Sequence, residues 1–272
     1  MPSVQGGHDL SPSVPLKTIL TDLSLTSGLI LCLDAADENS YSGSGQTWSD
    51  VSGTSNDYYL GAGSGSSTDD PTFNAGGYWD LDGGDYFTPV SASKLSTIDD
   101  MHQDNADFTW WARVYTVAGG GSAQYLLNNN INGSNQNDVG VIWRNLGTTT
   151  QTNQVQVYDV PVNNLEMANQ TTDTISNDAW HNIALSVDEA SGGTASFAYI
   201  DGGIMDSGFD GTYSSPNTGV ATDTLNIGAT TAPTPGNFLQ NGSKLAAFAM
   251  WTSSLTTSNL ADIDAEMQRS EG

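Results

Sequence analysis

Several short segments of the chain alternate between apolar and polar side chains. In residues 107–117, DFTWWARVYTV, the apolar positions of one face are Phe108, Trp110, Ala112 and Val114. This period of two is typical of a β-strand. Residues 180–188, WHNIALSVD, alternate in the same way. Residues 195–202, ASFAYIDG, follow a Gly-Gly turn, and we expect them to form the hairpin partner of that strand.

Two further segments are apolar almost without interruption. Residues 28–35 read GLILCLDA, and residues 243–255 read SKLAAFAMWTSSL. Short continuous apolar runs predict strands that are buried on both faces. We expect the second of these strands to be central in its sheet. Cys32 is the one cysteine of the chain, so no internal disulfide forms, and it lies in the first run as a small buried apolar residue.

The two ends of the chain have other patterns. Residues 1–27 are polar and proline-containing and predict an extended N-terminal arm, with one short turn of helix near Leu16–Leu23. After the last strand, residues 260, 263 and 267 are apolar at helical spacing, which predicts a short C-terminal helix. Thr257 or Ser258 is the expected N-cap of this helix.

Taken together, many short strands recur at spacings of about 8–15 residues, with almost no helix between them. This organisation predicts an all-β fold, an antiparallel two-sheet β-sandwich or jelly roll. We expect one domain over residues 28–272, preceded by the arm of residues 1–27.

The order of the motifs resembles that of laminin-G-like and concanavalin-A-like jelly-roll domains. Six segments carry the resemblance: WDLDGGDYFT (79–88), DFTWWARVYT (107–116), WHNIALSVD (180–188), AYIDG (198–202), LNIGA (225–229) and GSKLAAFAMWTSSLTTSNL (242–260). The resemblance implies a concanavalin A-like jelly roll with a short terminal helix. It also implies a structural role for His181, which would point with Ile183 into or along the core, while Asp201 and Gly202 shape a turn. Asn182 departs from the family pattern, which has a second histidine there.

A narrower resemblance lies in residues 27–53, SGLILCLDAADENSYSGSGQTWSDVSG. This segment is similar to the opening of lamin-G-like domains in tailed-phage virion proteins. The family's Asn-Gly-Asn after Ser-Gly is replaced here by TSND. The resemblance implies a protein displayed on a virus particle.

The charge of the chain limits the kinds of partner that it can bind. It has 31 acidic and 6 basic residues, a formal net charge of -25. Such a surface repels nucleic acid and anionic membranes, so we expect neither as a partner. No apolar stretch approaches the roughly 20 residues that span a bilayer. The N-terminal residues also lack the pattern of a secretory leader, so we expect assembly in a host cytoplasm.

Acidic turns offer one candidate for a cofactor. Asp80, Asp82 and Asp85 lie in WDLDGGD, and Asp69 and Asp70 lie in a nearby loop. Oxygen ligands in a glycine-rich loop suit Ca²⁺, although the twelfth-position glutamate of an EF-hand is absent. The alternative is that acidic turns simply follow from the composition. Calcium is the only cofactor that the sequence suggests.

Aromatic side chains offer a candidate platform for a saccharide. The candidates are Tyr41, Trp48, Tyr58, Tyr59 and Trp79. The alternative is that these aromatics belong to the core of the sandwich, as most aromatics in such folds do.

The sequence gives little support for an enzymatic function. Asp262, Asp264 and Glu266 have the spacing of the carboxylates of a glycoside hydrolase strand, but they lie in the predicted helix. Alternate residues of a helix point apart. With three histidines and no Ser-His-Asp pattern, we expect no catalytic residues and no enzymatic activity.

These observations favour a non-enzymatic virion structural protein, a phage capsid decoration or head-fibre protein on the virion surface. Its arm would bind the major capsid protein or another virion protein, and the domain would form homo-oligomers. The alternative is a carbohydrate-binding adhesin module on a tail or fibre that contacts host surface glycans.

Overall fold

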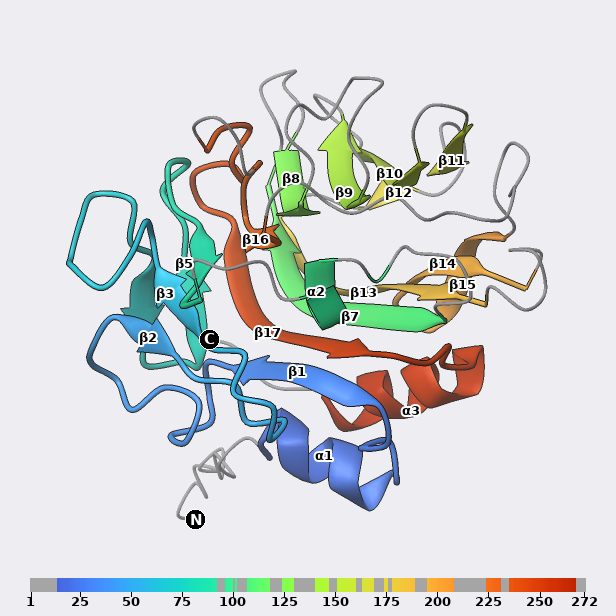
Figure 1. Ribbon diagram of the computed structural model, residues 1–272, viewed down its shortest axis with the longest axis horizontal. Helices are drawn as coiled ribbons and strands as arrows, with labels where there is room; N and C mark the ends of the chain where they lie inside the picture. The colour runs from blue at the N-terminus through green and yellow to red at the C-terminus, as the bar shows by residue number, and fades with distance from the viewer. Residues whose placement is uncertain are drawn as a thin grey trace, which may run out of the picture.

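The computed structural model describes residues 14–91, 96–99, 101, 107–117, 124–129, 140–146, 151–159, 163–168, 174–175, 178–188, 195–207, 224–230 and 235–267. Within these residues two antiparallel β-sheets lie face to face, and two helices cover the outside of one sheet (Figure 1). This arrangement confirms the predicted all-β, antiparallel two-sheet β-sandwich with a short C-terminal helix.

The first sheet has eight strands in its described part, in the order β15-β14-β13-β7-β17-β5-β4, and β1 also pairs with β17. Its strands are β1 (Leu29–Asp34), β4 (Thr72–Asn74), β5 (Tyr78–Asp80), β7 (Phe108–Thr116), β13 (Ala179–Val187), β14 (Phe197–Ile200), β15 (Gly203–Ser207) and β17 (Lys244–Trp251).

The second sheet has nine strands in its described part, in the order β11-β10-β9-β8-β16-β6-β3-β2, with β12 beside β10. Its strands are β2 (Thr47–Trp48), β3 (Tyr58–Leu60), β6 (Phe87–Pro89), β8 (Gln124–Asn128), β9 (Gly140–Leu146), β10 (Gln151–Asp159), β11 (Asn163–Ala168), β12 (Thr174–Ile175) and β16 (Asn226–Ile227).

The strands predicted from apolar patterns lie in the middle of the first sheet. β7 pairs with β13 on one side and with β17 on the other, and β14 is the hairpin partner of β13. All residues of β1 are buried, and so are all residues of β17 after Lys244. The predictions of a hairpin at β13–β14, of a doubly buried β1 and of a central β17 are therefore confirmed.

The segment from 79 to 88 behaves differently from a hairpin. β5 pairs with β4 and β17 in the first sheet, whereas β6 pairs with β3 and β16 in the second. The Gly83-Gly84 turn therefore carries the chain from one sheet to the other. Gly83 has a positive φ of 93°, a backbone conformation that favours glycine.

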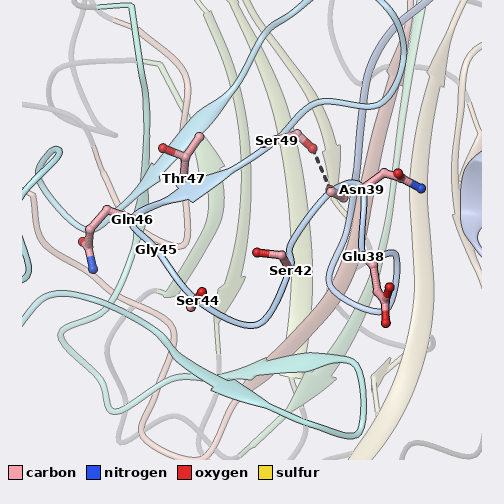
Figure 2. Close-up of a pocket in the computed structure, with 9 residues that line it drawn as sticks. Glu38, Asn39, Ser42, Ser44, Gly45, Gln46, Thr47 and Ser49 are labelled. Carbon is pink, nitrogen blue, oxygen red and sulfur yellow. Dashed lines mark hydrogen bonds between the residues drawn. The ribbon is translucent and has the colours of Figure 1, made fainter.

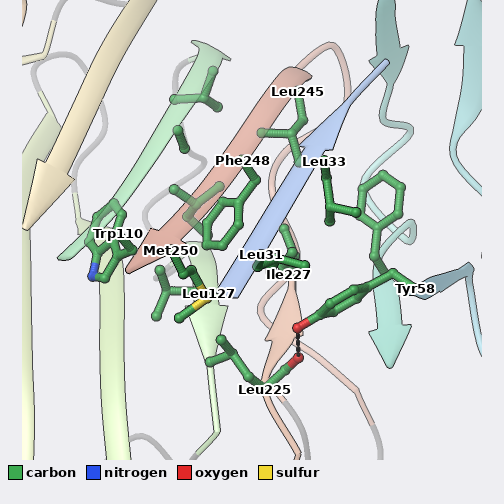
Figure 3. Close-up of a cluster of buried hydrophobic side chains, with 14 of the residues drawn as sticks. Leu31, Leu33, Tyr58, Trp110, Leu127, Leu225, Ile227, Leu245, Phe248 and Met250 are labelled. Carbon is green, nitrogen blue, oxygen red and sulfur yellow. Dashed lines mark hydrogen bonds between the residues drawn. The ribbon is translucent and has the colours of Figure 1, made fainter. Parts of the chain in front are cut away.

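The main core fills the space between the two sheets. It joins the inner faces of β1, β7, β13 and β17 to strands of the second sheet, and Figure 3 shows Trp110, Phe248 and Met250 facing Leu127 and Ile227. Burial of these side chains is the main source of stability for a chain without disulfides.

A second cluster lies on the outer side of the first sheet, under α1 (Leu16–Asp22) and α3 (Thr257–Glu266). The remaining helix, α2 (Ser96–Asp99), is a single turn. Leu16, Ile19 and Leu20 of α1 and Leu260 and Ile263 of α3 are buried against Trp111, Ala249 and Trp251. The two helices thus cover part of the outer face (Figure 1).

Part of the predicted arm belongs to this outer layer. The Leu16 N–H donates to the Asp34 carboxylate at 2.7 Å, and the Trp251 indole donates to the Leu25 carbonyl at 2.7 Å. Residues 16–25 are therefore fastened to the sandwich by hydrogen bonds as well as by apolar contacts. Residues 1–13 lie outside the described residues.

The C-terminal helix begins one residue earlier than predicted. Thr256 is the N-cap, and its hydroxyl accepts a hydrogen bond from the Asn259 N–H while the Asn259 side chain accepts one from the Thr256 N–H. This reciprocal capping box satisfies two backbone donors, so the predicted caps Thr257 and Ser258 are wrong. In the described part of the chain, no helix has the length and apolar character needed to cross a membrane.

Candidate functional site

The loop between β1 and β2 forms an open pocket of about 270 Å³. Figure 2 shows that one stretch of chain wraps around it. Hydroxyl and amide side chains dominate the wall, and Glu38 supplies its one carboxylate. The lining residues are Glu38, Asn39, Ser40, Ser42, Ser44, Gly45, Gln46, Thr47 and Ser49.

Hydrogen bonds within the loop fix the shape of this pocket. Asp37 is buried, and its carboxylate accepts from the Asn39 backbone and side chain at 2.9 Å. The Ser40 hydroxyl donates to the Ser49 carbonyl at 2.6 Å, and the Ser49 N–H donates to the Ser40 carbonyl at 2.8 Å. Tyr41 packs beneath the loop and donates to the Gly45 carbonyl at 3.1 Å. The pocket is therefore preformed.

Several polar groups of the wall are left for a ligand. Ser42 and Ser44 are exposed. The side chains of Gln46 and Thr47 are partly exposed. A sugar ring offers donors and acceptors at every hydroxyl, and side-chain hydroxyls and amides can meet both kinds of group. The pocket is chemically suited to binding a polyhydroxylated molecule.

The predicted aromatic platform is largely part of the core. Trp48, Tyr58 and Trp79 are fully buried, and Tyr41 is 7% exposed. Trp79 has edge contacts with the rings of Tyr41 and Trp48, at centroid distances of 4.5 and 5.5 Å. These four side chains cannot stack on a saccharide, so the alternative assignment to the core is correct for them. Only Tyr59 of the five candidates is partly exposed.

The three calcium candidates do not converge. Asp80 accepts from the Asn74 amide at 3.1 Å, Asp82 accepts from the Gly84 N–H at 2.9 Å, and Asp85 accepts from the Asp82 N–H at 2.8 Å. Asp80 thus bonds across the β4–β5 strand pair, whereas Asp82 and Asp85 bond within the turn that follows β5. No group of three histidine, cysteine or acidic side chains able to hold a metal ion occurs among the described residues. Asp82 and Asp85 are neighbours, but the three carboxylates do not form a metal-binding group in the described structure.

Asp85 nevertheless has an unusual environment. It is 2% exposed, and one of its carboxylate oxygens has no hydrogen-bond partner in the described structure. Burial, reinforced by the neighbouring Asp82 carboxylate, raises the pKa of Asp85 to about 7. This carboxyl group therefore titrates near neutral pH.

His181 has the structural surroundings that the resemblance implied. It is 6% exposed, and its Nδ1 lies 2.6 Å from a carboxylate oxygen of Asp201. The other oxygen of Asp201 accepts from the Asn182 N–H at 2.8 Å. Asp201 occupies the turn between β14 and β15 with a positive φ of 45°. The pair fastens this turn to β13.

The three carboxylates of the C-terminal helix point in different directions. Asp264 faces the sheet, where it accepts from the Tyr199 hydroxyl at 2.7 Å and from the Trp111 indole at 3.2 Å. Asp262 and Glu266 are exposed. Burial raises the pKa of Asp264 to about 6 despite these two donors. The three groups therefore do not form the paired carboxylates of a glycoside hydrolase.

A second surface feature is not apparent from the sequence. On the outer face of the first sheet, beyond the helices, Trp180, Tyr115 and Tyr78 contact one another through Trp180 at centroid distances of 5.6 and 5.7 Å. Arg113 and Lys244 lie over these rings. We call these five residues the cation–aromatic patch. Its signal in the sequence is that two of only six basic residues fall on polar-face positions of aromatic-rich strands.

The fold is similar to that of several solved structures. The binding domain of Paraclostridial Mosquitocidal Protein 1 superposes with a TM-score of 0.58 at 13% identity, over 87% of this chain and 52% of that chain. Botulinum neurotoxin type C, whose cell entry depends on interaction with two ganglioside molecules, gives a TM-score of 0.59 at 11% identity, over 90% of this chain and 52% of the toxin chain.

Trypanosoma rangeli sialidase in complex with sialic acid gives a TM-score of 0.54 at 14% identity, over 87% of this chain and 32% of the sialidase chain. The chain thus spans about half the length of the toxin chains and a third of the sialidase chain. At these identities the likeness concerns the β-sandwich fold alone. No protein-family model matches the sequence, and no curated protein matches it significantly.

Proposed function

We propose that this chain is a non-catalytic carbohydrate-binding module and that the β1–β2 loop pocket receives the saccharide. The observation that carries the proposal is a preformed, hydroxyl- and amide-lined hollow of about 270 Å³ on the surface of a β-sandwich. Ligand pockets of proteins begin at about 300 Å³. The hollow is thus close to the lower end of this range, which suits a small part of a longer saccharide.

Preorganisation supports binding in this loop. The hydrogen bonds of Asp37, Ser40 and Tyr41 already hold the loop in place, so a ligand would not have to order it. A binding site that is ordered in advance loses less conformational entropy when it binds.

The composition of the wall supports binding rather than hydrolysis. Hydrolysis of a glycosidic bond usually requires two carboxyl groups on opposite sides of the bond. The described lining holds Glu38 as its one carboxylate and contains no histidine or cysteine. We therefore propose that a bound saccharide is held and released unchanged.

The similarity to solved structures supports the proposal at the level of the fold. Two of the similar structures are described as binding domains or by their interaction with gangliosides, and a third holds sialic acid. This sandwich fold therefore occurs in proteins that recognise glycans.

A glycan array probed with the intact chain tests the proposal. Ser44→Tyr places a ring at the pocket, and Ser64→Tyr makes the same change at an exposed loop serine outside the pocket lining. We expect the wild type and Ser64→Tyr to bind the same saccharides, with at least a tenfold loss for Ser44→Tyr. Equal binding by both variants, or no binding by the wild type, would contradict the pocket assignment.

We further propose the virion surface as the setting of this module. The support is the resemblance of residues 27–53 to phage virion domains, and the loop pocket lies within this same segment. A capsid protein as partner of the N-terminal residues and assembly into homo-oligomers belong to this proposal.

Co-sedimentation with undecorated capsids tests the setting. The shortened chain should begin at Val14 rather than at Gly28, because removal of α1 would uncover Trp251 and other buried residues of the outer layer. We expect the full chain to pellet with capsids and the shortened chain to stay in solution. If neither chain pellets, the capsid role is wrong.

A further inference from the structure

We propose that the cation–aromatic patch is a second binding site, distinct from the loop pocket, and that it binds the carboxylate of an acidic sugar. The proposal rests on the proposed carbohydrate-binding function for its ligand class only. Its residues, Tyr78, Arg113, Tyr115, Trp180 and Lys244, come from four neighbouring strands and share none of the pocket lining.

Strand register brings these residues together. Trp180 lies opposite Tyr115 across β13 and β7, and Tyr115 lies opposite Lys244 across β7 and β17. Arg113 is two residues before Tyr115 on the same face. Tyr78 reaches the group from β5 and contacts Trp180 at 5.6 Å. The patch is therefore set by the pairing of β13, β7 and β17, with Tyr78 added from β5.

Both cations are positioned by aromatic rings. The Lys244 ammonium lies 4.5 Å from the Tyr78 ring centroid and 5.2 Å from that of Tyr115. The Arg113 guanidinium lies 5.4 Å from the Trp180 ring centroid and also donates to the Asn182 side-chain oxygen at 3.0 Å. Arg113, Tyr115, Trp180 and Lys244 remain partly exposed. Two positive charges are thus held at the surface in fixed places.

The charge of this patch contrasts with that of the chain. The net charge is -25, and only six residues are basic. Asp80 lies opposite Lys244 in register, but its carboxylate accepts from Asn74, and no carboxylate lies within ion-pair distance of Lys244 among the described residues. The positive charge of Lys244 is therefore available to an anion from solution.

The combination of charges and rings selects the ligand class. A guanidinium and an ammonium suit a carboxylate, and aromatic side chains pack against the apolar C–H faces of sugar rings. A neutral saccharide would offer the Lys244 ammonium no negative charge. An acidic sugar, which carries a carboxylate on a ring, satisfies both features.

Calorimetric titration of the intact chain tests this site. The probes are tri-galacturonate with its methyl-esterified form, and sialyllactose with lactose. The first pair keeps every sugar ring and removes the negative charges, whereas the second pair removes the whole acidic ring. We expect the wild type to bind at least one acidic probe at least tenfold more tightly than its neutral counterpart.

The matched variants are Lys244→Gln, Arg113→Gln and Lys17→Gln. Lys17 belongs to α1 and donates to the Ser52 carbonyl, so its loss changes the net charge equally but leaves the patch intact. We expect each patch variant to weaken binding of the acidic probe at least tenfold, and Lys17→Gln by less than twofold. Lys244→Arg should retain binding, which would separate loss of charge from loss of folding.

Several results would overturn the proposal. These are an equal loss for Lys17→Gln, an equal affinity for charged and neutral probes, or no acidic probe bound. Loss of a dimer in sedimentation of the patch variants, without any loss of saccharide affinity, would assign the patch to contact between copies. Ser44→Tyr separates the two sites, because it should abolish pocket binding and leave the acidic probe bound here.

Discussion

The two faces of the first sheet use the same strands and are covered in different ways. On the inner face, Trp110 and Phe248 are buried against the second sheet. On the outer face, Trp111 is covered by α1 and α3, whereas Arg113 and Tyr115 of the same strand lie beyond the helices and remain partly exposed. Where helices cover the sheet, its side chains are apolar, and where they do not, rings and cations take their place.

An aromatic residue in a strand therefore has no fixed role. Its position relative to the covering layer decides whether it contributes to stability or to recognition. Substitutions of matched residues on the two faces test this difference.

The largest expected effect is on the inner face. Trp110 is fully buried, so Trp110→Ala should lower the free energy of unfolding by about 4 kcal/mol, through lost burial and the cavity left behind. Trp180→Ala on the outer face should cost about 1 kcal/mol, because Trp180 is already partly exposed. Urea unfolding measures both values. Equal losses of stability would mean that Trp180 contributes to the fold as much as a core residue does, and the two faces would then not differ.

A smaller effect is expected under the helices. Asp264→Ala leaves the buried Trp111 indole and Tyr199 hydroxyl without their acceptor, and should cost about 2 kcal/mol. Asp262→Ala on the exposed side of the same helix is the control and should change stability by less than about 0.5 kcal/mol. If the two variants unfold at the same urea concentration, the hydrogen bonds of Asp264 do not stabilise the outer layer.

Asp85 lies where the chain crosses from the first sheet to the second, and it should make the stability of the protein depend on pH. The pKa of Asp85 rises from its usual 3.8 to about 7 in the folded protein, so folding favours the protonated form. The stability that Asp85 contributes is therefore fully present below about pH 4 and is lost as the pH rises through 7.

Asp85→Asn keeps the side chain neutral at every pH. It should match the wild type near pH 4 and exceed it by about 1–2 kcal/mol at pH 8. Thermal unfolding in a pH series measures the difference. A variant that is less stable than the wild type at pH 8 would mean that the Asp85 carboxylate is stabilised in a way that its burial does not indicate.

The smallest expected effect is at the patch itself. Lys244→Gln should change the free energy of unfolding by about 0.5 kcal/mol, because cation–π contacts at partly exposed sites are weak. The same substitution should weaken the binding of acidic saccharides at least tenfold. A large loss of stability in urea unfolding would assign Lys244 to the fold instead.

The sequence predicted the sandwich well because its strands alternate or are wholly apolar, as in β7 and β17. It did not indicate which sheets the strands on either side of the Gly83-Gly84 turn join, since local pattern does not reveal that they enter different sheets. It left open whether Trp48 and Trp79 form a platform or belong to the core, because the burial of an aromatic depends on strands distant in the sequence.

The candidate sites were harder to predict. The pocket serines lie in a glycine- and serine-rich loop whose sequence indicates only a turn, and their arrangement depends on the buried Asp37 and Tyr41. The patch joins Tyr78 to Lys244 across 166 positions of the sequence. Only the register of the sheet brings such residues together.

Chemical-shift mapping by NMR on the intact chain tests the central claim, carbohydrate binding, most directly. Saccharides found on the array would be titrated while backbone amide shifts are followed. We predict shifts in residues 38–49 for pocket ligands, and at Arg113, Trp180 and Lys244 for carboxylate-bearing sugars. Shifts confined to other surfaces, or none with any saccharide, would contradict the assignment of this chain as a carbohydrate-binding module.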